Sequence, residues 1–243
     1  MLVIRVNLGM KHVVVCVVVV FSILRVEHSW AQEMSTFQVW IEQTAVVNVA
    51  NRLTSNIYLT EYFVGGSTSY QSVALTPSLT YAAAPWLLVE GAVYNEYVNQ
   101  KDISDIIEVR PYVALRYTDA LGRFEPYAFI RQEFRNIYYV DSQEWDVRYR
   151  VRLRAGTRIA ITDEYISPES LYGIADVELF RNLDAAPQEY FNARIRLHGG
   201  LGYRITNDVT VEAHYMYQFS RSFADMPFDS HDNIVRATVR KAF

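Results

Sequence analysis

The sequence predicts an all-β fold, an antiparallel transmembrane β-barrel of 10–12 strands that follows a cleaved signal peptide. The segment 145–161, WDVRYRVRLRAGTRIAI, places arginines on one face and apolar or hydroxyl-bearing residues on the other, because successive side chains of a strand point to opposite faces. Strands of soluble proteins mostly run to about 5–6 residues, whereas a tilted strand crossing a bilayer needs roughly 9–11. A long strand with one polar face is therefore typical of a membrane barrel.

The N-terminal segment predicts export. Lys11 and His12 precede the apolar run 13–24, and Ser29-Trp30-Ala31 provides a small-x-small cleavage site. The run is shorter than the ~20 residues that a membrane helix requires. We therefore expect a signal peptide at 1–31, translated from Met1 or from Met10, and a barrel domain at 32–243.

Composition narrows the functional classes. A net charge of −4 argues against binding of nucleic acid, and the 18 tyrosines suit strands and membrane interfaces. The only cysteine, Cys16, lies inside the predicted signal peptide, and no metal-ligand spacing or phosphate loop occurs, so we expect no cofactor. The expected location is the bacterial outer membrane, with its lipid as the surrounding partner.

Alternation continues through most of the chain. Segment 37–49 sets Phe37 and Ile41 against Gln38 and Glu42, whereas the facing of 54–64 stays open. Pro77 lies in the middle of a strand, where its missing N–H deletes a ladder hydrogen bond, so we expect a local defect. The candidate strands, in order, are 37–49, 54–64, 71–81, 86–97, 106–117, 124–139, 145–161, 171–182, 191–204, 209–220 and 233–243.

The connections alternate between short turns and longer polar loops, as in outer-membrane barrels, where the two rims differ in this way. The segment 162–170 departs from this rule, since it is long where a short turn is due. The eleven candidate strands also conflict with the even number that bacterial single-chain barrels normally have. Either 37–49 is not a full wall strand, giving ten, or one strand is missed, giving twelve; we favour twelve.

The inward face carries many charges of both signs. Its arginines are Arg110, Arg116, Arg131, Arg135, Arg148, Arg150, Arg152, Arg154, Arg194 and Arg196. Its acids include Glu108, Glu133, Asp176, Glu178 and Glu212, together with Glu90, Glu96 and Asp146. Guanidinium forks match carboxylates, and 10–12 strands enclose less space than the 16 of porins. The main interpretation is a lumen largely filled by an arginine–carboxylate–tyrosine network.

Two alternatives remain open. Asp176 and Glu178 neutralise only part of the charge on 148–154, so the lumen can instead be a narrow channel for small anionic solutes. This arginine row resembles the arginine tracks of twelve-stranded channels for acidic oligosaccharides. The weaker alternative is a hydrolase using His198 and His214 with Ser220 or Glu212, but no nucleophile motif flanks them. We expect no enzymatic activity.

Two resemblances complete the interpretation. Phe243, the final residue of an alternating strand, resembles the signal read by the barrel insertion machinery of the bacterial outer membrane. The ordered patterns EVRPY, FIRQEFR, RYRVRLR, DVELF and NARIRLHGGLGY, spread over residues 108–203, resemble an uncharacterised family of outer-membrane barrels. That family is common in Bacteroidetes-type bacteria and is carried as a domain of unknown function. The resemblance implies a fold and a location but supplies no catalytic residues.

Overall fold

The computed structural model describes residues 34–65, 70–100, 104–183, 193–221 and 230–243. The predicted signal peptide 1–31 lies outside these residues, as do most of the predicted loops 183–189 and 222–231. No helix in the described ranges is long and apolar enough to cross a membrane.

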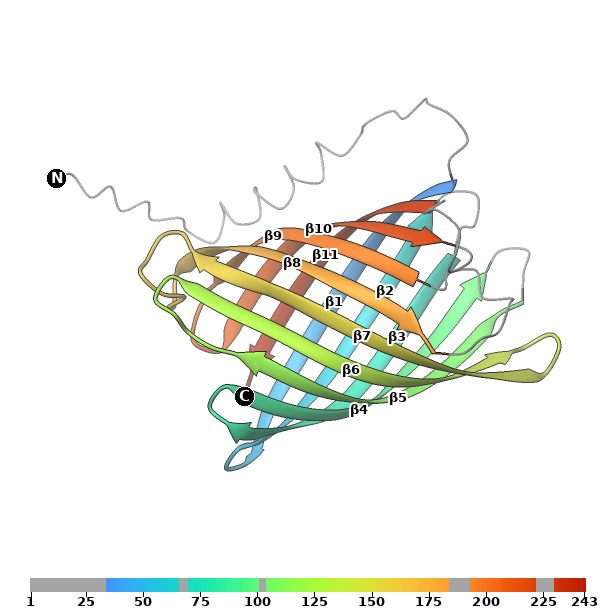
Figure 1. Cartoon of the computed structure of the whole chain (residues 1–243), viewed down its shortest axis with the longest axis horizontal. Coiled ribbons are helices and arrows are strands. Elements are labelled where there is room, and N and C mark those ends of the chain that lie inside the picture. The colour runs from blue at the N-terminus through green and yellow to red at the C-terminus, as the bar shows by residue number, and fades with distance from the viewer. Residues whose placement is uncertain (1–33, 66–69, 101–103, 184–192, 222–229) are drawn as a thin grey trace. The chain divides into compact units, whose positions relative to one another are not determined.

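The described residues form one closed barrel in which each strand pairs with its neighbours in the sequence (Figure 1). The strands are β1 (Met34–Ala50), β2 (Leu53–Gly65), β3 (Tyr70–Ala84), β4 (Leu87–Gln100), β5 (Ile106–Thr118), β6 (Phe124–Tyr139), β7 (Glu144–Ala160), β8 (Ser170–Asn182), β9 (Ala193–Arg204), β10 (Val209–Arg221) and β11 (Ser230–Ala242). They run for 12 to 17 residues, which confirms the long alternating strands.

The count of eleven described strands corrects the expected even number. β1 is a full wall strand, and it pairs in parallel with β11, from Met34 opposite Ser230 to Val46 opposite Ala242. In a meander of antiparallel neighbours, an odd number makes the first and last strands run the same way, so closure has to be parallel. Parallel pairing is slightly less stable per residue than antiparallel pairing. The start of β1 and the end of β11 consequently lie at opposite rims of the barrel.

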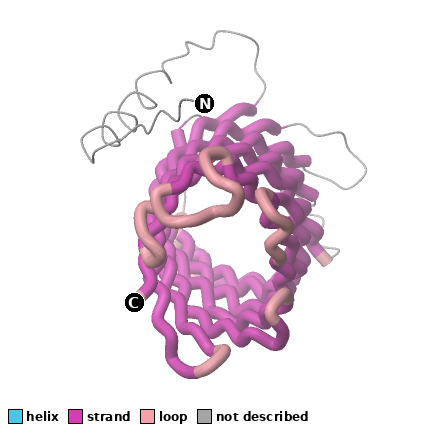
Figure 2. The backbone as a smooth tube through the Cα atoms, turned by 90° about the vertical axis from the view of Figure 1, so that its left-hand side faces the viewer, coloured by secondary structure: helices cyan, strands magenta, loops and turns pink. Residues whose placement is uncertain are grey.

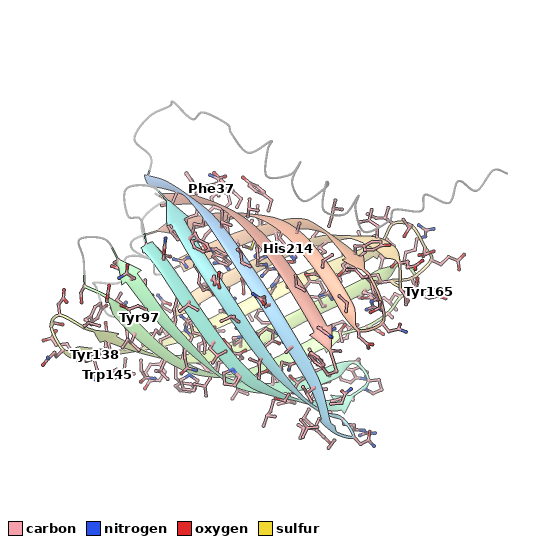
Figure 3. The ribbon with its side chains drawn as sticks, turned by 180° about the vertical axis from the view of Figure 1, so that it is seen from behind. Phe37, Tyr97, Tyr138, Trp145, Tyr165 and His214 are labelled. Atoms are coloured by element: carbon pink, nitrogen blue, oxygen red, sulfur yellow. The ribbon has the colours of Figure 1, made fainter. Side chains whose placement is uncertain are left out.

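The outward face of the barrel is apolar between two aromatic rims. Outward residues such as Val113 and Leu115 leave 55% and 48% of their surface exposed. Tyr97, Tyr138 and Trp145 lie at one rim in Figure 3, with Tyr165 near the other. An apolar band between aromatic girdles is the surface that a lipid bilayer selects in a barrel.

Two prolines interrupt the ladder in the same way. Pairing of β3 with β4 is interrupted around Pro77, as expected, and pairing of β5 with β6 is interrupted around Pro111. Asn95 donates its side-chain amide to two nearby backbone carbonyls, at 3.2 and 3.1 Å, and Asn136 donates to one at 3.0 Å. These amides supply donors beside backbone positions that proline leaves without one.

The long segment between β7 and β8 folds against the barrel wall. Ile166 is buried, and it packs with Ala160, Tyr172 and Ile174. Nη1 of Arg204 donates to the Ile166 carbonyl at 2.9 Å. Figure 2 looks onto this rim, where connecting segments border the mouth. The departure from the short-turn rule therefore reflects a folded segment with its own apolar anchor.

Candidate functional site in the lumen

All ten predicted arginines project from inward positions of β5, β6, β7 and β9. Strand register decides which carboxylates they meet. Arg131 on β6 lies opposite Arg152 on β7, and Glu133 lies opposite Arg150, so charges of both signs occupy neighbouring rows. Strand register therefore decides the ion pairs that form between strands, whereas pairs such as Arg148 with Asp146 form within one strand.

Glu133 links two arginines of the β7 row. Its side chain is fully buried, and its Oε2 accepts from Nε of Arg150 at 2.6 Å. Its Oε1 accepts from Nη1 of Arg152 at 3.1 Å. Both oxygens are therefore engaged by charge-assisted hydrogen bonds, the strong class for a buried carboxylate.

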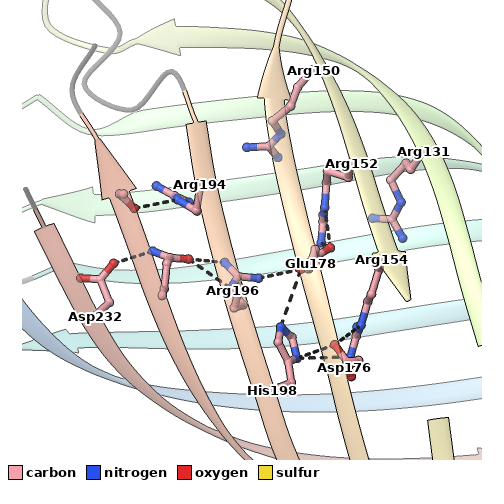
Figure 4. A network of polar contacts seen from close by, with 12 residues as sticks. Arg131, Arg150, Arg152, Arg154, Asp176, Glu178, Arg194, Arg196, His198 and Asp232 are labelled. Carbon is pink, nitrogen blue, oxygen red and sulfur yellow. Dashed lines mark hydrogen bonds and ion pairs between the residues drawn. The ribbon is translucent and has the colours of Figure 1, made fainter. Parts of the chain in front are cut away.

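The chain of contacts continues across the wall through Glu178 (Figure 4). Glu178 binds Arg152 through one oxygen and Nη1 of Arg196, at 3.2 Å, through the other. Arg196 donates to Oε1 of Gln218 at 2.6 Å, and Gln218 donates to Asp232. We call this series the charged belt; its members are Glu133, Arg150, Arg152, Glu178, Arg196, Gln218 and Asp232. It runs without a break from β6 to β11.

Asp176 is bound by side chains from two other strands, one of which reaches it over a glycine. Asp176 accepts from Nε and Nη2 of Arg154, each at 2.7 Å, and from the hydroxyl of Tyr127 at 2.5 Å. Tyr127 is on β6 and Asp176 is on β8, and the residue between them on β7 is Gly156. A Cβ at Gly156 would lie 2.2 Å from Cβ of Asp176. Glycine is therefore required here for close approach of the neighbouring strand.

The arginine row of β7 is more fully paired than its sequence suggests. Arg148 pairs with Asp146, Arg150 with Glu133, and Arg154 with Asp176, while Arg152 pairs with two acids. On β5 and β6, Glu108 accepts from Arg110 at 2.7 Å and from Arg135 at 2.8 and 3.1 Å. Within this row Asp176 and Glu178 pair only with Arg154 and Arg152, as expected, and Asp146 and Glu133 supply partners for Arg148 and Arg150.

Arg131 is the exception. Its Nη1 lies 3.7 Å from Glu133, whose oxygens already bind two other arginines, and its buried Nε has no hydrogen-bond partner. Its guanidinium lies 4.0 Å from the ring centroid of Tyr112 and 5.1 Å from that of Phe129. Aromatic faces partly stabilise a cation but leave its charge uncompensated.

The lumen wall formed by β2 and β3 has a different chemistry. Inward residues of β3 are small, and most carry hydroxyl groups: Ser72, Ala74, Thr76, Ser78 and Thr80. The Asn56 amide on β2 donates to the hydroxyls of Ser78 and Thr80, each at 3.1 Å. The structure also settles the facing of β2: Tyr58 lies at an inward position and Glu61 at an outward one.

Only part of the predicted hydrolase set assembles: His214 contacts Glu212 and lies on the strand next to that of His198, but Ser220 lies apart. Nε2 of His214 lies 3.0 Å from Oε2 of Glu212, and the Tyr172 hydroxyl donates to the same carboxylate at 2.7 Å. Ser220 instead accepts from Nε of Arg194 at 3.2 Å, and two inward residues of β10 separate it from His214. The expectation that the protein is not an enzyme stays a prediction.

Phe243 ends the chain beside the closure of the barrel. Its backbone N–H donates to the Val46 carbonyl of β1 at 2.9 Å, and its side chain is exposed. Nζ of Lys241 lies 4.6 Å from its ring centroid. Recognition by the insertion machinery stays a prediction.

Comparison with known proteins agrees with this architecture. A solved structure titled "NanC porin structure in rhombohedral crystal form" is similar, with a TM-score of 0.51 and 11% identity, covering 85% of this chain and 99% of that one. At this identity the likeness shows the fold alone. No curated protein matches the chain. The family model described as "Protein of unknown function (DUF2490)" matches residues 37–228, and the chain therefore belongs to the DUF2490 family.

Proposed function

We propose that the protein is an outer-membrane barrel whose lumen is constricted by the charged belt and which passes small solutes, with a preference for anions. The predicted signal peptide, the apolar band between aromatic rims and the likeness to a porin fold support the location. A purely structural barrel with a sealed lumen is the competing function.

The narrowness follows from the side chains that line the barrel. An 11-stranded barrel is narrower than a 16-stranded porin, so long side chains extend across much of its width. Belt residues bridge neighbouring strands from β6 to β11, and their carboxylates are almost fully buried. Separating a buried charge from its partner costs free energy, so the side chains of the belt stay in place.

The anion preference rests on one observation, the incompletely paired Arg131. The carboxylate nearest to its guanidinium is shared with two other arginines, which leaves positive charge in the lumen. Rings or tracks of arginine attract anions in pores and repel cations.

The location is tested on isolated outer membranes. A closed membrane barrel resists unfolding in detergent at room temperature, so we expect a change in gel mobility between unboiled and boiled samples. A protein recovered in the soluble fraction with no such change would contradict the barrel location and, with it, the channel.

The transport function is tested in planar bilayers under a salt gradient. We expect a small conductance whose reversal potential favours anions, a reduced preference in Arg131→Gln, and loss of it in the double variant Arg150→Glu, Arg152→Glu. Arg181→Gln is the matched control, because it removes the same charge from an exposed outward position of β8. Absence of conductance in the folded wild-type protein would overturn the channel and favour the sealed barrel.

A further inference from the structure

Three inward residues of β9, β10 and β11 carry buried polar atoms that lack hydrogen-bond partners. The atoms are Nε2 of His198, Nδ1 of His214 and Nε of Arg236. The two imidazole side chains are only 1% and 2% exposed. Buried polar groups are nearly always satisfied, so three such atoms in one part of the lumen call for an explanation.

Strand pairing places these residues next to one another. His214 lies directly opposite Arg236 on β11 and Gly200 on β9. His198 is the inward residue of β9 that precedes Gly200. A Cβ at Gly200 would lie 2.6 Å from the Ala213 carbonyl oxygen and 3.1 Å from His214 Nδ1, so glycine lets the His214 imidazole pack closely against β9. Directly opposite inward residues of neighbouring strands have Cβ atoms about 4.5–5.5 Å apart.

The contacts of His198 assign it as a donor at Nε2. Nη2 of Arg154 lies 3.2 Å from His198 Nδ1, and a guanidinium can only donate, so Nδ1 accepts and the proton is on Nε2. The Glu178 oxygen is 3.9 Å from Nε2, which is too far for a hydrogen bond. His198 therefore presents an N–H donor that has no acceptor.

His214 has the opposite character. Its Nε2 lies 3.0 Å from the Glu212 carboxylate, which accepts hydrogen bonds when ionised, so Nε2 carries the proton. In the neutral ring, Nδ1 is then a lone-pair acceptor without a donor. The pair of histidines thus offers one free donor and one free acceptor.

Arg236 supplies the charge. It makes no hydrogen bond or ion pair with any described residue, although its side chain is half-buried. The inward acids of β8 and β10 are already engaged: Glu212 by Tyr172 and His214, Asp176 by Arg154, and Glu178 by Arg152 and Arg196. On β1, Glu42 is the inward acid next to Trp40, which lies opposite Arg236, but no hydrogen bond or ion pair joins Glu42 to Arg236.

We propose that His198, His214 and Arg236 form a binding site for an oxyanion that also carries an acidic hydroxyl, of which hydrogen phosphate is the simplest example. Its anionic oxygens accept from Arg236 and from Nε2 of His198, while its P–OH donates to Nδ1 of His214. Sulfate has the same shape but no hydroxyl at neutral pH, so it leaves the His214 acceptor unpaired, which carries a penalty in a buried site. The site rests on the proposed function in one respect: the anion has to reach the lumen.

Binding is measured by titration calorimetry of the purified, folded barrel with inorganic phosphate and with sulfate at neutral pH. We expect saturable phosphate binding that is roughly tenfold tighter than sulfate binding, the ratio that one unpaired buried acceptor produces. Arg236→Gln is expected to lower the affinity for both anions by about tenfold or more, the loss typical of a hydrogen bond to a charged group. In His214→Phe we expect phosphate to lose its advantage over sulfate. Arg181→Gln on the outer face is expected to leave both affinities unchanged.

Each variant is first checked for the boiling-dependent gel shift, and Arg236→Lys, which keeps the charge, serves if Arg236→Gln does not fold. Equal binding of phosphate and sulfate by the wild type, no saturable binding, or unchanged binding in Arg236→Gln would overturn the site. Chloride conductance without phosphate binding would leave the channel standing and remove the site. Phosphate binding in detergent without conductance would support the site and overturn the channel.

Discussion

Two walls of the lumen pair their buried polar side chains with different chemistry. The wall from β6 to β9 buries guanidinium and carboxylate groups in a connected network, whereas β2 and β3 bury short hydroxyl side chains. A buried charge that loses its partner is strongly destabilising, but a buried hydroxyl loses only a modest hydrogen bond. The charged wall is therefore intolerant of single substitutions, and the hydroxyl wall is tolerant.

The two walls also differ in how far their side chains extend. Arg154 on β7 reaches His198 on β9, and Tyr172 on β8 reaches Glu212 on β10, each passing over an intervening strand. Inward glycines such as Gly202 make these passages possible. Side chains of the β3 face are too short for such contacts. The charged wall thus determines how narrow the lumen is.

The largest effect is expected for Glu178→Ala, which leaves Arg152 and Arg196 short of a carboxylate in a buried position. Breaking a buried ion pair from one side costs roughly 3–5 kcal/mol. We expect a loss of that size in the free energy of unfolding, measured by urea titration in detergent or lipid. Glu61→Ala, on the outward face of β2, removes the same group outside the network; an equal loss there would contradict the comparison.

The next largest effect is expected for Gly202→Val. A Cβ at this position would lie 2.2 Å from the buried Tyr172 ring, which passes over Gly202 to donate to Glu212. Overpacking of this kind costs about 1–3 kcal/mol. Gly91→Val is the control, because no heavy atom lies within 4 Å of a Cβ there. The two variants are compared by thermal and urea unfolding, and indistinguishable stabilities would refute the crossing role of Tyr172.

Tyr127→Phe tests a single contact of the charged wall. It removes the 2.5 Å hydrogen bond to Asp176 while keeping the ring. Hydrogen bonds to charged groups contribute about 1.5–3 kcal/mol, and Arg154 still binds the carboxylate, so we expect the lower part of that range. Tyr81→Phe, on the outward face of β3, is the control in the same unfolding assay. A stability change in Tyr127→Phe no larger than in Tyr81→Phe would argue against the bond.

Ser78→Ala is expected to have the smallest effect. It removes one of two hydroxyls that accept from Asn56, and Thr80 retains the other contact. The loss should be about 1 kcal/mol or less, the usual contribution of a neutral hydrogen bond. If unfolding shows a loss as large as that of Glu178→Ala, the two walls are not energetically different.

Much of this architecture is predictable from the sequence, because alternation alone decides which residues face the lumen. It placed Arg150 and Glu178 on the correct face, and Pro77 at a defect. Partner identity is different: the meeting of Glu133 with Arg150 and Arg152 depends on strand register, which alternation leaves undetermined.

The strand number could not be obtained in this way. The alternation of 37–49 looks the same whether its neighbour runs parallel or antiparallel, so nothing local signals the parallel pairing of β1 with β11. The eleven candidate strands match the eleven that the structure describes, and the expected total of twelve is wrong because it came from the even-number rule. The contact of Tyr127 with Asp176 across Gly156 was missed for a related reason, since it joins strands that are not neighbours.

The central claim, that the charged belt constricts the lumen, is tested most directly by single-channel conductance. The double variant Arg152→Ala, Glu178→Ala shortens the belt without changing net charge, and we predict a severalfold larger conductance than in the wild type. The matched double variant Thr76→Ala, Ser78→Ala shortens the hydroxyl wall, and its conductance should equal that of the wild type. Unchanged conductance in the belt variant, or an equal increase in both variants, would contradict the account.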